Sequence, residues 1–85
     1  MNTQLCLNKT AIFPGSDENI GFTASLSPDG VKIEVEGPFV PRTVQWNEIE
    51  DVEFLASLFW DAQVWEFREI IKMLAEAKNM RHLFP

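Results

Sequence analysis

The chain has 85 residues, 46% of them apolar, so we expect one small folded domain (residues 1–85) rather than a disordered segment. Thirteen acids against seven bases give a net charge of −6, which makes nucleic acid and anionic membranes unfavourable partners. The first ten residues do not have the pattern of a secretion signal, and the single cysteine, Cys6, excludes an internal disulfide, so the sequence predicts a cytoplasmic protein.

The first third of the chain alternates apolar and polar residues, which is typical of strands with one wet face. Residues 5–7 predict a short first strand at an edge of the sheet, and residues 14–19 have the composition of a loop. Residues 20–26 and 31–35 both alternate, and the intervening Ser27-Pro28-Asp29-Gly30 carries proline and glycine at typical turn positions. This stretch predicts a β-hairpin.

Two more extended segments are expected after the hairpin. Residues 42–46 predict a strand with Val44 and Trp46 on one side, and residues 47–51 have the composition of a turn. Residues 52–55 predict a further strand, with Val52 and Phe54 facing inward. The sheet would therefore be an antiparallel meander of four to five strands.

The C-terminal third predicts one long helix. Ser57 or Asp61 is the expected N-cap, and the helix should run to about Asn79. Its buried stripe is expected to comprise Val64, Phe67, Ile71 and Leu74, with Trp60 and Ile70 at the edges. The predicted fold class is α+β, with the sheet packed against this helix.

Between residues 31 and 55, two strands are followed by Trp46-Asn47-Glu48-Ile49 leading into Val52. This pattern resembles part of the sheet of PH- and GRAM-type domains, over less than a third of the chain. Such domains often bind phosphoinositides through basic residues of strands and loops. Here only Lys32 and Arg42 are available, amid carboxylates, so lipid binding is not expected and no family is assigned.

Trp65 falls off the predicted buried stripe, on a helix face with charged neighbours such as Arg68 and Lys72. It would either pack on the stems of those side chains or on a second sheet edge, or act as an anchor for a partner. Met73 and Met80 are also expected off the stripe, where flexible side chains adapt to a partner surface.

The negative charge is concentrated in the middle of the chain. Residues 34–66 hold eight acids and one base, for a net −7, while the remainder holds five acids and six bases, for +1. The densest group, which we call the acidic tract, consists of Glu48, Glu50, Asp51 and Glu53. The tract is interpreted as a solvated turn or as a surface for a basic protein. A divalent-metal site is the third alternative, although the spacing matches no EF-hand loop.

Catalysis is not predicted, because Cys6 and His82 lie in no recognisable motif and no phosphate-binding loop or metalloprotease motif occurs. No cofactor or metal is expected. The predicted function is a non-catalytic inhibitor, of the immunity, phage anti-defence or nucleic-acid-mimic type, that docks an acidic face on a basic protein, such as a nucleic-acid-processing enzyme. The alternative is a structural module that forms a homodimer or larger assembly through the Trp65, Met73 and Met80 side of the helix. The predicted partner-binding residues are Glu48, Glu50, Asp51, Glu53, Asp61, Trp65, Glu69 and Met73.

Overall fold

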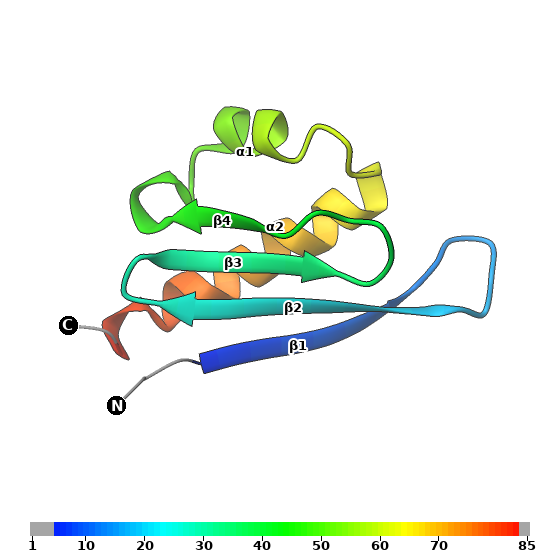
Figure 1. Ribbon diagram of the computed structural model, residues 1–85, viewed down its shortest axis with the longest axis horizontal. Coiled ribbons are helices and arrows are strands. Elements are labelled where there is room, and N and C mark those ends of the chain that lie inside the picture. The colour runs from blue at the N-terminus through cyan, green and yellow to red at the C-terminus, as the bar shows by residue number, and fades with distance from the viewer. Residues whose placement is uncertain (1–4, 84–85) are drawn as a thin grey trace.

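Four strands, in the spatial order β1-β2-β3-β4, form an antiparallel meander in the computed structural model, which describes residues 5–83 (Figure 1). The strands are β1 (Leu5–Ile12), β2 (Asn19–Ser27), β3 (Gly30–Val35) and β4 (Arg42–Gln45). The helices are α1 (Val52–Leu58) and α2 (Val64–Asn79), with short 3-10 turns η1 (Trp46–Glu48) and η2 (Arg81–Leu83). The predicted α+β class, with a long C-terminal helix on a meander sheet, is confirmed.

The predicted hairpin is formed by β2 and β3, with Ser27 paired to Gly30 across a turn made by Pro28 and Asp29. The hydroxyl of Ser27 accepts a hydrogen bond from the backbone N–H of Asp29, at 3.3 Å. A Cβ atom on Gly30 would lie 2.2 Å from the carbonyl oxygen of Val44 on the neighbouring strand. Glycine is therefore required here by the close approach of β4.

Strand β1 lies at an edge of the sheet, as predicted, but it is much longer than residues 5–7. All eight of its residues pair with β2, from Leu5 opposite Leu26 to Ile12 opposite Asn19. The second half of β1 was missed because its only large apolar residue is Ile12, so the alternation fades while the backbone pairing with β2 continues.

The strand predicted over residues 52–55 is wrong, because these residues begin helix α1, and residues 5–83 contain no fifth strand. Asp51 is the N-cap, and its carboxylate accepts a hydrogen bond from the backbone N–H of Phe54 at 3.1 Å. Helical spacing turns Leu55 and Phe59 into the core, while Val52, expected to face inward, is 60% exposed. The short apolar run fits either period, and the cap decides in favour of the helix.

Helix α2 begins at Val64, later than predicted, and ends at Asn79 as predicted. Gln63 is its N-cap, and its backbone N–H donates to the Glu66 carboxylate at 2.8 Å. Neither Ser57 nor Asp61 caps it. The fully buried residues of α2 are Ile70, Met73, Leu74 and Ala77.

The helix is thus rotated relative to the predicted stripe. Val64 is 71% exposed, and Phe67 and Ile71 pack only at the margin of the core. The expectation that Met73 lies off the core is also wrong, since it is 1% exposed. Apolar residues in α2 form two overlapping stripes with helical spacing, and the sheet buries the one centred between Ile70 and Leu74.

The core lies between α2 and the inner face of the sheet, where alternate residues of β2, β3 and β4 are buried. Helix α2 crosses this face so that its first turn lies at the same end of the molecule as the β1–β2 and β3–β4 loops (Figure 1). Both described chain ends lie at the opposite end. Within residues 5–83, neither helix has the length and apolar character that a bilayer crossing requires.

Candidate functional site

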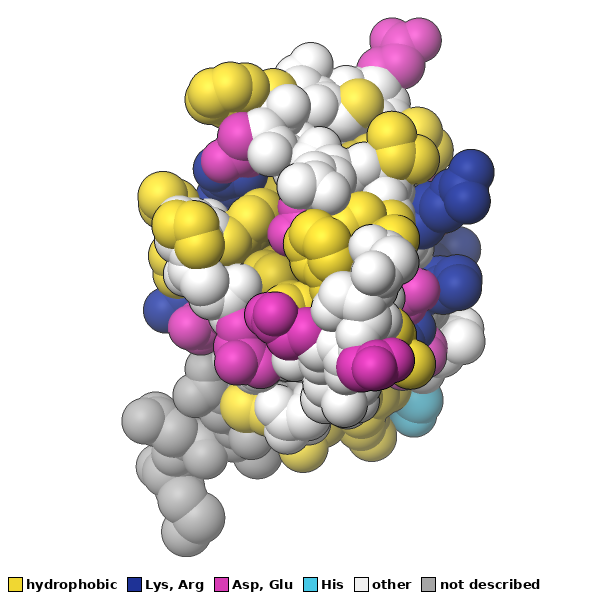
Figure 2. Space-filling model, turned by 90° about the vertical axis from the view of Figure 1, so that its right-hand side faces the viewer, with side chains coloured by type: hydrophobic (Ala, Val, Ile, Leu, Met, Phe, Trp, Pro, Cys, Tyr) yellow, Lys and Arg dark blue, Asp and Glu magenta, His cyan; other side chains and the backbone are white. Residues whose placement is uncertain are grey.

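A cleft of about 510 Å³ opens where the β1–β2 loop, the β3–β4 loop and the start of α2 meet. Its walls come from three segments that are distant in sequence, residues 13–20, 36–39 and 61–66. Figure 2 looks onto this end of the molecule, where hydrophobic side chains surround a hollow bordered by acidic side chains. We call this region the cleft end.

One wall of the cleft is aromatic and is built around Trp65. Its ring packs edge-to-face against Phe13, with centroids 5.6 Å apart, and against Phe22 of β2, at 5.9 Å. Its indole N–H donates to the side-chain oxygen of Gln63 at 2.9 Å. Trp65 therefore packs on Phe22 of the sheet and on the β1–β2 loop, and it also lines the cleft.

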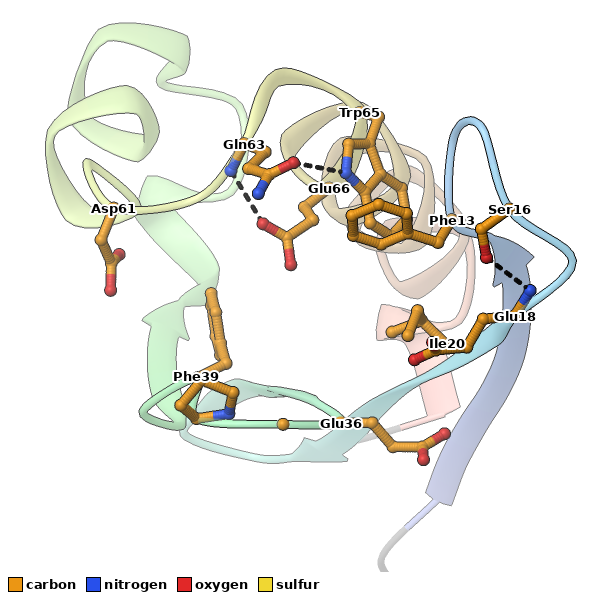
Figure 3. Close-up of a pocket in the computed structure, with 12 residues that line it drawn as sticks. Phe13, Ser16, Glu18, Ile20, Glu36, Phe39, Asp61, Gln63, Trp65 and Glu66 are labelled. Atoms are coloured by element: carbon orange, nitrogen blue, oxygen red, sulfur yellow. Dashed lines mark hydrogen bonds between the residues drawn. The ribbon is translucent and has the colours of Figure 1, made fainter.

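The facing wall is Phe39, in the loop between β3 and β4. Gly37 has a φ of +103°, a conformation that favours glycine, and lets the chain turn sharply before this ring. Phe39 stacks on Phe59 with centroids 6.1 Å apart, which fixes its position against the core. Figure 3 shows it across the open centre of the cleft from Phe13 and Trp65.

Carboxylates surround these rings, and none of the described residues that line the cleft is Lys, Arg or His. The acidic lining residues are Glu18, Glu36, Asp61 and Glu66. Glu36 accepts a hydrogen bond from the backbone N–H of Gly21 at 2.6 Å, and Glu66 accepts one from Gln63. Within residues 5–83, each of these two carboxylates is hydrogen-bonded through Oε1 alone. Its second oxygen, Oε2, can therefore accept from an incoming donor.

Asp61 is the exception, because Arg42 neutralises it. The guanidinium donates two hydrogen bonds to the carboxylate, at 2.5 and 2.7 Å, and lies over the ring of Phe39 at 4.8 Å. These hydrogen bonds hold the pKa of Asp61 below its ordinary value and raise the pKa of Arg42. The pair joins β4 to the α1–α2 connection and so stabilises one side of the cleft.

The acidic tract lies away from the cleft, and three of its four members have local partners. Glu48 accepts a hydrogen bond from the backbone N–H of Gln45 at 3.2 Å, and Asp51 caps α1. Glu50 forms an ion pair with Lys78 near the end of α2. Glu53 is exposed in the first turn of α1, where a negative charge favours the helix dipole.

The last two predicted residues serve the fold. Glu69 is paired with Lys9 of β1 at 2.5 Å and with Lys72 at 3.5 Å, and the hydrogen bond from Lys9 lowers the pKa of Glu69. Met73 is in the core and does not reach the surface. Of the eight predicted residues, only Asp61 and Trp65 line the cleft.

Sequence reasoning missed the aromatic rings Phe13 and Phe39 and the carboxylates that accompany them. A signal was present, because both rings adjoin proline and glycine in loops, at Phe13-Pro14-Gly15 and Gly37-Pro38-Phe39. Trp60 was expected at the edge of the buried stripe, which is wrong. It lies beyond the C-cap of α1 and is 78% exposed.

The acidic residues of the cleft come from all three of its segments and are not gathered at one point. Within residues 5–83, no three His, Cys, Asp or Glu side chains lie in a position to hold a metal ion together. The arrangement offers negative potential and aromatic surface, which are features of a site for a cationic group.

The resemblance to PH- and GRAM-type sheets depended on a strand beginning at Val52, but residues 52–55 are helical. Comparison of the chain with models of protein families, with curated proteins and with solved structures gave no match in any of the three.

Proposed function

We propose that this protein is a non-catalytic binding module that docks the cleft end on a basic protein surface. The supporting observation is the cleft itself, in which acidic residues surround aromatic rings and none of the lining residues within 5–83 is Lys, Arg or His. Opposite charge accelerates encounter with a basic protein, and aromatic side chains are frequent anchors of interfaces.

The cleft end is favoured over the acidic tract because its carboxylates border aromatic rings in a cleft, which no residue of the tract lines. Backbone hydrogen bonds do not separate the two regions, since Glu36 and Glu66 accept them as Glu48 and Asp51 do. Among the described residues, Glu50 of the tract is paired with Lys78, whereas Glu18, Glu36 and Glu66 form no ion pair with Lys or Arg. An acidic-tract interface is the competing proposal.

Within this class, the small size and the acidic charge favour an inhibitor of the immunity, phage anti-defence or nucleic-acid-mimic type. Its target would be a basic protein such as a nucleic-acid-processing enzyme, met in the cytoplasm. This narrower assignment is an analogy from size and charge, and the identity of the captured protein tests it.

The experiment is a pull-down from the native host with three tagged baits and identification of the captured proteins by mass spectrometry. The baits are the natural chain, a cleft variant (Glu18, Glu36 and Glu66→Gln) and a tract variant (Glu48, Glu50 and Glu53→Gln). Each variant removes three negative charges, taking the net charge from −6 to −3, and glutamine keeps an oxygen that accepts the same backbone hydrogen bonds.

The natural chain and the tract variant should capture the same basic protein, and the cleft variant should lose it. Circular dichroism should show all three baits folded alike. Retention of the protein by a folded cleft variant would contradict the proposal, and its loss from the tract variant alone would transfer the interface to the acidic tract.

A second candidate, self-assembly, is favoured by one observation. Trp60 is 78% exposed and Val64 is 71% exposed, so two large apolar side chains face solvent on the connection between α1 and α2 and at the start of α2. The Trp65, Met73 and Met80 side is less suitable because Met73 is buried. Light scattering should then give a mass above that of one chain, reduced by Trp60→Ala. A monomeric natural chain would exclude this candidate.

A further inference from the structure

We propose that a single arginine side chain of the partner enters the cleft, with its guanidinium between Phe39 and Trp65 and paired with Glu66. This assignment rests on the proposed function and specifies the chemical group that the cleft end recognises. The cleft's size, the placement of its rings and carboxylates, and the environment of Arg42 in the same fold support it.

The size and shape of the cleft suit one long side chain. A volume of about 510 Å³ lies well within the range of small-ligand sites and far exceeds that of a water molecule. Phe39 stands on one side of the open centre, and Phe13 and Trp65 stand on the other (Figure 3). Apolar rings on both sides can cover the aliphatic stem of a basic residue. Because Phe39 already carries the guanidinium of Arg42 at 4.8 Å, the cationic end of the incoming residue is attracted chiefly by Trp65 and Glu66.

The charge of the cleft selects a cation. Glu66 projects from the first turn of α2 toward the space between the aromatic walls (Figure 3). Its Oε1 is held by the backbone N–H of Gln63 at 2.8 Å, so the carboxylate is oriented before any ligand arrives. Glu18 and Glu36 add negative potential at the rim, which leaves an anionic ligand without a partner.

Arginine fits this arrangement better than lysine, and Arg42 demonstrates the chemistry within the same molecule. Its guanidinium is paired twice with Asp61 and lies over the rings of Phe39 and Phe59, at 4.8 and 5.7 Å. A planar guanidinium stacks on rings while its five N–H groups donate to more than one carboxylate. A lysine ammonium is more strongly hydrated and cannot stack in this way.

The test is a nuclear magnetic resonance titration of the ¹⁵N-labelled full chain with blocked five-residue peptides. Their central residue is arginine, lysine or the neutral isostere citrulline, with glycine on both sides. The indole N–H of Trp65, bonded to Gln63 beside the cleft, is the reporter. The indole N–H of Trp46 donates to the carbonyl of Ser27 at 2.8 Å, at the other end of β4, and serves as an internal control.

The arginine peptide should shift the Trp65 signal to saturation and leave the Trp46 signal unchanged. The lysine peptide should bind roughly threefold more weakly or worse, because it loses the stacking on the rings. Citrulline should give no shift. Glu66→Gln should weaken the arginine peptide roughly tenfold, as expected for the loss of a charged hydrogen bond. The exposed Glu53→Gln, with the same change in charge, should leave its affinity unchanged.

Equal shifts with the arginine and citrulline peptides, or an unaltered affinity in Glu66→Gln, would overturn the assignment. It would also be overturned if no peptide shifted the Trp65 signal while the cleft variant lost the captured protein. In that last case the proposed function would stand without the arginine. Retention of the captured protein by the cleft variant would instead contradict the proposed function itself.

Discussion

The cleft end and the acidic tract each contain three glutamates, but these side chains have different surroundings. Glu48 and Glu36 each accept a backbone hydrogen bond, and Glu50 is also paired with Lys78. Within residues 5–83, Glu18 and Glu36 form no ion pair and line a cleft that contains aromatic rings. The residues of the tract are close together in sequence, and three of them contact backbone or side-chain groups of the same molecule. The cleft acids are scattered in sequence and come together only in the fold. Charge density along a chain therefore does not show which carboxylates gather in the fold.

The comparison depends first on how α2 is rotated on the sheet, since that rotation directs Trp65 and Glu66 to the cleft. Ile70→Ala removes a fully buried side chain and should lower the free energy of unfolding by about 2–5 kcal/mol. Val64→Ala changes an exposed residue and should alter it by less than about 0.5 kcal/mol. Urea unfolding of both variants measures this difference. A larger loss in Val64→Ala would restore the stripe predicted from sequence.

Single substitutions test whether an acid of the tract supports the fold while an acid of the cleft does not. Asp51→Ala removes the N-cap of α1 and should cost about 0.5–2 kcal/mol of unfolding free energy. Glu18→Ala, at the cleft rim, should change it by less than about 0.5 kcal/mol, because this exposed side chain supports no helix end. If thermal unfolding showed equal losses for the two, the acids of the tract and the cleft would not differ in their structural role.

A smaller effect is expected from acid, through the two paired carboxylates. Hydrogen bonds from Arg42 and Lys9 lower the folded-state pKa values of Asp61 and Glu69. The two pairs therefore contribute fully to the free energy of unfolding above the ordinary carboxyl pKa of about 4. This stabilisation is lost as the pH falls through the lowered folded-state pKa values. Unfolding free energy measured from pH 7 to pH 3 should decline less in Asp61→Asn and in Glu69→Gln than in the natural chain. Identical declines would show that neither pair stabilises the fold.

Local features could be predicted from the sequence. The turn at Ser27-Pro28-Asp29-Gly30 was recognisable because its residues define the backbone conformation within four positions. The α1 segment has a short apolar run that fits both the strand and the helix period, and only the cap at Asp51 favours the helix. The rotation of α2 was misjudged because so many of its residues are apolar that only the sheet decides which of them are buried.

The cleft was not predictable in the same way. Phe39 contacts Phe59 although β4, η1 and α1 lie between them in sequence, and Trp65 contacts Phe13 from more than 50 positions along the chain. No periodicity records such contacts. What the sequence did show was an aromatic residue beside glycine and proline in each loop, and this signal is informative only once the topology brings the two loops to one end of the sheet.

The central claim is that the cleft end, and not the acidic tract, receives the basic partner. The direct measurement is the association rate constant with the captured protein as a function of ionic strength, for the natural chain, the cleft variant and the tract variant. Both variants carry the same net charge, so any difference between them reports position. The cleft variant should associate more slowly and with a weaker dependence on salt, while the tract variant follows the natural chain more closely. A slower, flatter curve for the tract variant, with the cleft variant unchanged, would contradict the account.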